Sequence, residues 1–372
     1  MNKQDFAFFK ELVEAPSPSG FEQPAQRVIR KALADVADDI RTDVMGNVVA
    51  HIKGPEGAPR LMLAGHCDEI GFMIKYVDEQ GYLFFAPIGG VDAHLVPGQR
   101  VTVHTKTGPV PGVVGKRPIH QTEPQDREKV MPFKNQFIDI GCSSKKAAEK
   151  LVSIGDPVTF SVGVERLQGT RLTSRALDDK MGAYIVAQVL REVRRQNNLV
   201  VDLYGVSTVQ EEVGLRGGAT SAYGVQPDIG IAVEVGFASD YPDADHKHSG
   251  EISLGKGPII ARGPNINPVL FDLLVSTAKT EKIPYQVIGI PRATGTDANV
   301  MQLVRGGVAT ALVSIPLRYM HTPVEVLDWA DLEGAVKLLS SLCGRLTEKS
   351  PLSRPDRLSL PGIKSCNGRK NA

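Results

Sequence analysis

The chain has 372 residues, of which 42% are hydrophobic and 23% are charged, and its formal net charge is +1. This composition supplies enough apolar surface for one to three compact units. The balance of charge argues against nucleic-acid binding, which needs a basic excess or a basic stripe. The sequence also lacks a run of about 18 apolar residues, so no membrane span is expected.

The sequence favours a cytoplasmic protein. Lys10, Glu11 and Glu14 interrupt the apolar residues of the N-terminal segment, which therefore does not resemble a secretory signal. The four cysteines are scattered without CxxC spacing, as expected for free thiols in a reducing compartment: Cys67, Cys142, Cys343 and Cys366.

Two helices and two strands are expected in the first 69 residues. Apolar residues repeat at helical spacing over residues 5–14, and a stretch rich in proline and serine ends this pattern. Helical spacing returns over residues 22–37, and the short apolar runs at residues 47–52 and 60–63 are typical of strands. These elements form the first part of an α/β unit.

The pattern changes over residues 70–164. Short apolar runs are separated there by Gly, Pro and Asp, and helical spacing is confined to residues 144–152. The predicted strands are residues 71–76, 82–86, 101–104, 110–114, 137–140 and 158–160. This segment is therefore expected to be a small β-rich domain inserted into the α/β unit.

Helices and strands alternate again after residue 171. Helices are predicted at residues 181–193, 269–281, 297–304 and 328–346. Asp328 is the expected N-cap of the last helix. Strands are predicted at residues 200–209, 229–235, 285–288 and 308–315. Such alternation predicts an α/β fold built on a mixed sheet with helices on both faces.

The expected domain organisation is discontinuous. Residues 1–69 and 165–347 form the α/β domain, and residues 70–164 form the inserted domain. Residues 348–372 are polar and rich in proline, so a disordered tail is expected there.

The first candidate site follows the strand that begins at residue 60. His66 comes directly after its last apolar residues, and an extended backbone points His66 and Asp68 to the same side. A carboxylate beside a histidine can orient the imidazole toward a metal ion. Ligands of open α/β sheets bind outside the carboxyl ends of strands, but taken alone this motif fits a site and a simple polar turn equally well.

Asp178 and Asp179 form the second candidate, just before the predicted helix at residues 181–193. Two acids at a helix N-terminus are most simply explained as caps that accept hydrogen bonds from backbone N–H groups. Taken alone, this pair indicates a helix cap more than a functional site.

Glu211 and Glu212 end a largely apolar strand and give the strongest single signal. Burying two like charges is unfavourable unless a cation or a proton compensates them. One carboxylate can bind a metal ion while its neighbour acts as a general base toward water. A solvated acidic turn is the alternative.

Glu234 and His321 are weaker candidates. Glu234 lies inside an apolar strand, which fits a buried ligand and an outward-facing residue on an edge strand equally well. His321 follows the strand predicted at residues 308–315, where a lone histidine is more often structural than a ligand.

Together, the five places provide two histidines and several carboxylates. Mixed nitrogen and oxygen ligands suit borderline divalent ions such as Zn²⁺ or Co²⁺, whereas oxygen alone would favour Mg²⁺ or Ca²⁺. A site for two divalent ions that share a bridging carboxylate is therefore expected.

In this order, the same motifs resemble the M42 family of metallopeptidases, the glutamyl aminopeptidase and tetrahedral aminopeptidase group. The resemblance covers residues 5–345. It is carried by residues 18–22, 65–72, 97–101, 137–141, 177–180, 210–214, 254–258, 295–298 and 318–325.

The resemblance implies which residues bind metal. His66 and Glu234 resemble the ligands of one ion. Glu212 and His321 resemble the ligands of the other, and Asp178 resembles the carboxylate that bridges the two. Glu234 stands where the family more often has Asp, and Lys180 where it more often has Arg.

The resemblance also implies a reaction and an assembly. Glu211 resembles the general base and Asp68 the acid that orients His66, in an aminopeptidase that releases N-terminal residues through a metal-bridging hydroxide. The inserted segment resembles the PDZ-like dimerisation domain of the family, whose dimers commonly assemble into dodecamers. Peptides are the expected substrates.

Two other functions stay open at this point. One is a related amidohydrolase or deacylase that acts on small amides. The other is a metal-binding assembly protein without turnover, although such a site would have no need of a general base at Glu211.

Overall fold

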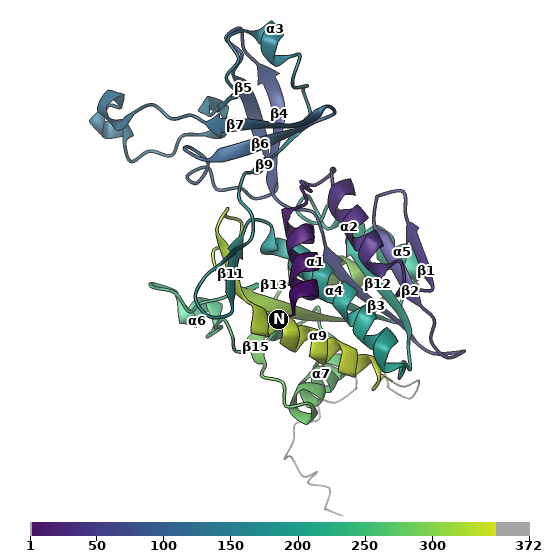
Figure 1. Cartoon of the computed structure of the whole chain (residues 1–372). Helices are drawn as coiled ribbons and strands as arrows, with labels where there is room; N and C mark the ends of the chain where they lie inside the picture. Colours follow the sequence, from purple (N-terminus) through teal and green to yellow (C-terminus); the bar gives the residue numbers. More distant parts are fainter. Residues whose placement is uncertain (1, 347–372) are drawn as a thin grey trace, which may run out of the picture.

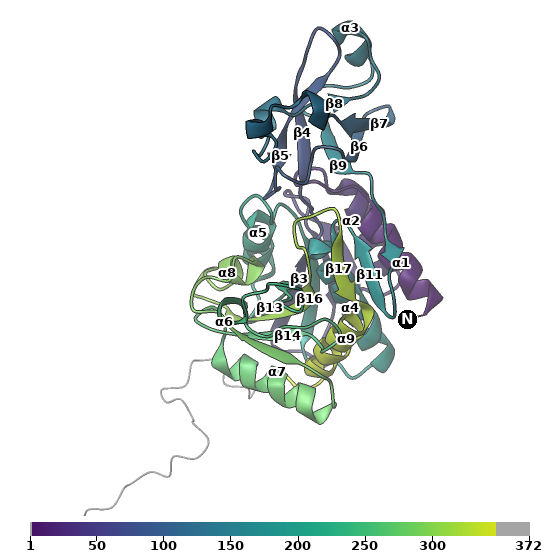
Figure 2. The same ribbon diagram turned by 90° about the vertical axis from the view of Figure 1, so that its left-hand side faces the viewer.

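The computed structural model describes residues 2–346, so the tail expected at residues 348–372 lies outside the described residues. Figures 1 and 2 show two parts, a larger α/β part and a smaller, mainly β part at one end of it. Within the described residues, no helix has the length and hydrophobicity that crossing a membrane requires.

A mixed sheet forms the centre of the α/β part, with the strand order β1-β2-β12-β3-β13-β16-β14-β15. Its central strands β12, β3, β13 and β16 are parallel to one another, whereas β2 and β14 flank them in antiparallel orientation. The strands are β1 (Asp39–Thr42), β2 (Val48–Ile52), β3 (Arg60–His66), β12 (Asp202–Thr208), β13 (Ile229–Phe237), β14 (Ile259–Arg262), β15 (Gln286–Gly289) and β16 (Ala309–Leu317).

Helices cover both faces of this sheet, which confirms the predicted architecture (Figure 2). On β3, Leu61 and Leu63 face one hydrophobic core while Met62 and Ala64 face the other, as a two-residue period requires. The first core includes α1 (Lys3–Glu14), α2 (Gln23–Leu33), α4 (Leu177–Gln196), α7 (Pro268–Thr280) and α9 (Trp329–Cys343). The second includes α5 (Arg216–Val225) and α8 (Asp297–Met301).

The segment expected to be β-rich forms a closed barrel with its own hydrophobic core. Its strands are β4 (Gly71–Val77), β5 (Leu83–Ile88), β6 (Arg100–Thr105), β7 (Gly108–Val114), β8 (Ile138–Asp139) and β9 (Pro157–Phe160). Between β7 and β8 lie three single-turn helices, η1 (Ile119–Gln121), η2 (Pro124–Asp126) and η3 (Phe133–Asn135). The helix predicted at residues 144–152 is shorter than expected, because α3 covers only Lys145–Ala148.

Several elements differ from the sequence-based prediction. Helix α2 ends at Leu33, and the residues after it form a turn in which the N–H of Val36 donates to the oxygen of Leu33. A third sheet, of β10 (Glu165–Arg166), β11 (Arg171–Ser174) and β17 (Glu325–Asp328), was not predicted, and neither were β1, β14, α5 and the short helix α6 (His246–Ser249). The N-cap role of Asp328 is confirmed, since its side chain accepts a hydrogen bond from the N–H of Ala330.

Close packing between β3 and α4 requires glycine at two positions beside the parallel strands. A Cβ atom on Gly65 would lie 2.4 Å from the backbone of Gly182, and one on Gly182 would lie 2.3 Å from Asp179. Only residues without side chains let the end of β3 approach the first turn of α4 this closely. That approach sets the end of β3 directly against the acidic start of α4.

Candidate metal centre

The five candidate places meet at one edge of the sheet. The parallel strands end there together, with His66 at the end of β3 opposite Thr208 at the end of β12. Glu234 comes from β13, Asp178 from the start of α4, and His321 from the loop after β16. The carboxyl ends of parallel strands therefore form the site, as expected for an open α/β sheet.

Asp178 lies between the two histidines. Its Oδ1 atom is 3.2 Å from Nε2 of His66, and its Oδ2 atom is 3.3 Å from Nε2 of His321. The peptide bond between Asp178 and Asp179 is cis. One carboxylate thus presents an oxygen to each imidazole.

Two groups of side chains can each hold a metal ion, and they share Asp178. His66 and Glu234 complete one group, and Glu212 and His321 complete the other, with the ligand atoms of each group within 4.8 Å of one another. Glu234 Oε1 is buried and has no hydrogen-bond partner within the described residues. A buried carboxylate oxygen without a donor is a suitable ligand for a cation.

The carboxylates strongly favour positive charge at both imidazoles. Hydrogen bonds to Asp178 and Glu212 raise the pKa of His321 to about 11. Burial acts to lower the pKa of His66, but the charges of Glu234 and Glu211 outweigh it and the pKa is well above its usual value. An environment that stabilises an imidazolium also stabilises a metal cation held at the same place.

Glu211 lies beside the two groups and belongs to neither. Its Oε2 atom is 3.7 Å from Nε2 of His66. Burial, together with the charges of Asp297 and Glu212, raises the pKa of Glu211 to about 8. A carboxylate with a pKa near neutrality can both accept and return a proton.

Asp68 holds the turn that carries Glu211 and Glu212. Its Oδ1 atom accepts a hydrogen bond of 3.0 Å from the N–H of Glu211, and its Oδ2 atom accepts one of 3.2 Å from the N–H of Glu212. Nδ1 of His66 is 3.1 Å from the backbone oxygen of Asp68 and 3.5 Å from Oδ1. The sequence pointed to the side chain of Asp68 for orienting His66, but its backbone oxygen is the closer acceptor.

The structure also distinguishes the alternative interpretations of Glu234, of the Glu211–Glu212 pair and of the Asp178–Asp179 pair. Glu234 is 3% exposed, and β13 lies between β3 and β16, so the edge-strand alternative is wrong. The side chains of Glu211 and Glu212 are 10% and 5% exposed, so they do not form a solvated turn. Asp179 does act as a cap, since its Oδ1 accepts a hydrogen bond of 3.1 Å from the N–H of Gly182.

Two further buried carboxylates at the site were not singled out by the sequence. Glu325 Oε1 accepts a hydrogen bond from the N–H of His321, and its Oε2 accepts from the N–H of Asp178. Asp297 Oδ2 accepts a hydrogen bond of 2.6 Å from Thr208, and burial raises the pKa of Asp297 to about 6. Both lie in segments that carried the family resemblance, which was the only available signal.

Comparison with known proteins assigns the family. The model of the M42 glutamyl aminopeptidase family matches residues 46–338. The chain belongs to the M42 family. It is therefore a peptidase by descent, and the resemblance seen in its sequence is confirmed.

M42 relatives match along nearly their whole length. A lysyl aminopeptidase of Pyrococcus furiosus is 40% identical over 347 residues, which cover 92% of this chain and 97% of the relative. A TET aminopeptidase from a marine sediment Thaumarchaeota archaeon superimposes with a TM-score of 0.89 at 33% identity, covering 93% of this chain and 98% of that one. The TET1 peptidase of Pyrococcus horikoshii, described as assembling into a tetrahedron or a large octahedral shell, has a TM-score of 0.83 at 30% identity, covering 92% and 100%.

In this M42 chain, Lys180 belongs to a buried ion cluster next to the site. It is fully buried, and its ammonium group donates to the backbone oxygens of Val13 and Ala15 and to Glu69, which satisfies all three of its hydrogens. Arg175 pairs with the other oxygen of Glu69. The lysine thus keeps the charge of the more usual arginine, while Arg175 supplies a guanidinium group.

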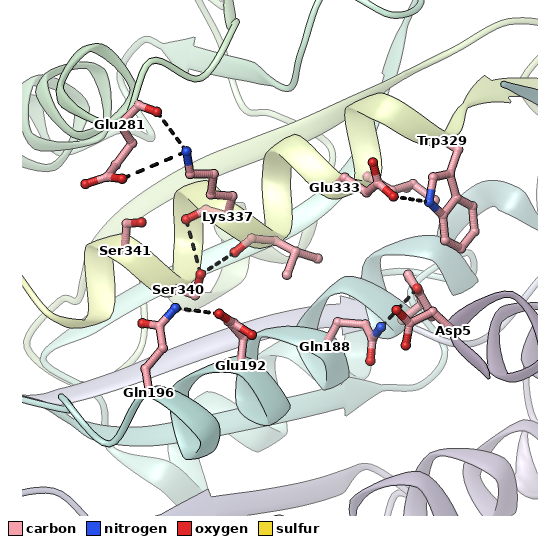
Figure 3. Close-up of a pocket in the computed structure, with 13 residues that line it drawn as sticks. Asp5, Gln188, Glu192, Gln196, Glu281, Trp329, Glu333, Lys337, Ser340 and Ser341 are labelled. Atoms are coloured by element: carbon pink, nitrogen blue, oxygen red, sulfur yellow. Dashed lines mark hydrogen bonds and ion pairs between the residues drawn. The ribbon is translucent and has the colours of Figure 1, made fainter. Parts of the chain in front are cut away.

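A separate groove lies on the outer helices of the M42 chain. It encloses about 390 Å³ between α4 and α9, and Trp329 lies at one end of it (Figure 3). Its charged lining residues are Asp5, Glu192, Glu281, Glu333 and Lys337. The candidate metal ligands do not line this groove, so it is not part of the metal centre.

Proposed function

We propose that this protein is an aminopeptidase that uses two divalent metal ions to release N-terminal residues from peptides. The observation that carries the proposal is the position of Asp178, which presents one oxygen to each of two histidine–carboxylate groups. Relatives named as aminopeptidases match 92% and 93% of this chain, which supports the same class of substrate.

The donor atoms fit two borderline divalent ions. His66, Asp178 and Glu234 would hold one ion, and Asp178, Glu212 and His321 the other. Imidazole nitrogen with carboxylate oxygen is a ligand set for Zn²⁺ or Co²⁺. When bound, such ions supply Lewis acidity, which lowers the pKa of a water molecule and polarises a peptide carbonyl.

Glu211 is the proposed general base. Its carboxylate takes a proton from the attacking water as the new C–O bond forms, and then returns this proton to the amide nitrogen, so that the peptide C–N bond breaks and the amine leaves. Burial raises the pKa of Glu211 toward neutrality, which suits a group that must both accept and return a proton. Asp68 keeps this base in place through the backbone N–H groups of Glu211 and Glu212.

A preference for free N-termini follows from the charge of the site. Glu211, Glu234 and Asp297 are buried carboxylates; burial raises the pKa of Glu234, and the charges of Glu211 and Asp297 raise it further. Their combined potential attracts the ammonium group of an unblocked peptide and gives nothing to an acylated one.

We assign residues 1–69 and 165–347 to the catalytic domain and residues 70–164 to an inserted dimerisation domain. The closed barrel with its own core, from Gly71 to Phe160, supports this division. A TET1 peptidase that is described as a dodecamer, and as able to form a tetrahedron or a large octahedral shell, supports the proposal that this chain assembles into dimers and then dodecamers. A PDZ-like ancestry of the barrel is part of the same proposal.

Paired substrates test the function. Purified protein supplied with Zn²⁺ or Co²⁺ is expected to release nitroaniline from aminoacyl-nitroanilides and not from their N-acetylated counterparts. Release from the acetylated substrates would instead show an amidohydrolase that acts on small amides. Bound metal without release from either substrate would show a metal-binding assembly protein.

A further inference from the structure

The two proposed metal-binding histidines are oriented by different parts of the chain. Nδ1 of His66 lies 3.1 Å from the backbone oxygen of Asp68, two residues further along the same segment. Nδ1 of His321 lies 2.9 Å from the backbone oxygen of Gly90, which follows β5 of the barrel. The first histidine is therefore held from within the α/β part, and the second is held from the barrel.

The segment that carries Gly90 is fixed to the barrel. Val91 packs against the barrel core, and Val96 is fully buried in it. The backbone oxygen of Ala93 accepts a hydrogen bond of 3.1 Å from the side chain of Gln136, which is itself buried. The position of the Gly90 oxygen thus depends on how the barrel sits against the α/β part.

Neither Gly89 nor Gly90 leaves room for a side chain. A Cβ atom on Gly90 would lie 3.0 Å from Nδ1 of His321. A Cβ atom on Gly89, where φ is +75°, would lie 3.2 Å from Oε2 of Glu212 and 2.8 Å from Cγ2 of Ile70. A side chain at either glycine would therefore press against a ligand of the same metal-binding group.

We propose that Gly89 and Gly90 are positioning residues through which the barrel sets the affinity of the Asp178–Glu212–His321 group for its divalent ion. The proposal rests on the two-metal function given above. The Gly90 oxygen accepts a hydrogen bond from Nδ1–H of His321, which leaves Nε2 as the metal-binding atom. That atom faces Oδ2 of Asp178 at 3.3 Å and Oε1 of Glu212 at 3.4 Å.

Metal titration of single variants tests the proposal. Full-length protein is stripped of metal, and Zn²⁺ is titrated in competition with a chromophoric chelator. Wild-type protein is expected to bind two ions. Gly90→Ala is expected to lower the affinity for the ion held by the Asp178–Glu212–His321 group by about 10- to 100-fold, and to leave the affinity for the other ion unchanged. Gly306→Ala is the control, because a Cβ atom there meets nothing within 4 Å and the backbone needs no positive φ.

A second pair of variants separates contact from backbone strain. Gly89→Ala and Gly98→Ala both place a side chain at positive φ, +75° and +89°, but the Cβ atom on Gly98 meets nothing within 4 Å. Only Gly89→Ala is expected to lower the affinity for the ion held by the Asp178–Glu212–His321 group. If Gly90→Ala does not fold, Gly89→Ala and Gly98→Ala still test whether a side chain at the proposed positioning residues lowers the metal affinity.

The outcomes distinguish this inference from the proposed function. If wild-type protein binds two ions and the glycine variants bind both equally well, the positioning role is overturned and the two-metal site stands. The positioning role is also overturned if the glycine variants lose affinity for both ions equally, or if the control variants lose as much affinity. If wild-type protein binds no ion, the proposed function itself fails.

Discussion

The carboxylate of Glu325 accepts a hydrogen bond from the backbone N–H of Asp178 at a distance of 3.2 Å. Its other oxygen accepts one of 2.9 Å from the backbone N–H of His321, and Leu177 donates a third. Glu325 belongs to neither metal-binding group, yet it joins the backbones of two proposed ligands. It ties the start of α4 to the loop after β16 and so fixes the distance between Asp178 and His321.

Replacing Glu325 with glutamine is therefore expected to weaken metal binding. The amide nitrogen of glutamine cannot accept a hydrogen bond, so at least one backbone N–H group loses its partner. We expect a loss of about 10- to 100-fold in affinity for at least one ion, measured by chelator competition. Glu251→Gln makes the same chemical change at an exposed position and is expected to match the wild type. Equal affinities in the two variants would contradict this role for Glu325.

Glu211→Gln separates catalysis from metal binding. The amide cannot take a proton from water, so turnover of an aminoacyl-nitroanilide is expected to fall by about 100- to 10,000-fold. Bound metal is expected to stay at the wild-type amount, because Glu211 belongs to neither ligand group. Mass spectrometry of metal content and steady-state kinetics give the two values. A variant that keeps its activity would remove Glu211 from the mechanism.

Asp178→Asn and His321→Ala are expected to differ in how many ions they lose. Asp178 is shared by both groups, whereas His321 belongs to one. Asparagine at position 178 removes the charge that serves both ions, so both affinities are expected to fall. Alanine at position 321 is expected to lower the affinity for one ion only. Titration with Zn²⁺ reads the two affinities separately. Loss of one ion in both variants would show that Asp178 is not a bridge.

His104 is expected to make stability depend on pH below neutrality. Burial, and after it the charge of Arg175, lowers the pKa of His104 from 6.5 to about 4. Between these values the unfolded chain binds the proton and the folded chain does not, so the free energy of unfolding decreases as the pH falls from about 6.5 to 4.

The His104→Gln variant tests this dependence. Glutamine can replace the hydrogen bond of 2.8 Å between Nε2 of His104 and Thr159 but does not titrate. Thermal unfolding from pH 7 to pH 4.5 is expected to show a smaller loss of stability for this variant than for the wild type. His94→Gln changes an exposed histidine of the same segment and is expected to follow the wild type. Parallel curves for all three proteins would show that His104 does not contribute.

The sequence identified most of the candidate ligands because they lie where an apolar strand or a helix begins or ends, whereas Glu234 was noticed as an acid inside an apolar strand. Such positions are visible in a linear pattern, and the parallel order of β12, β3 and β13 then brings them to one edge. Glu234 could not be decided by its pattern alone, since only the strand order shows that β13 is central.

The residues that hold the ligands were not visible in the same way. Glu325 binds the backbone N–H group of Asp178, 147 positions away, and Gly90 acts through its own backbone oxygen. Helix α5 was missed because its glycines disfavour a helix, yet a Cβ atom on Gly218 would lie 2.3 Å from Asp297. These contacts depend on tertiary packing, which hydrophobic spacing does not encode.

Metal content tests the central claim most directly. Wild-type protein is saturated with Zn²⁺ or Co²⁺, freed of excess metal, and measured by mass spectrometry together with its activity on an aminoacyl-nitroanilide. The shared position of Asp178 predicts two ions per chain and activity that disappears when a chelator removes them. One ion per chain, or activity that survives complete removal of metal, would contradict the two-metal aminopeptidase.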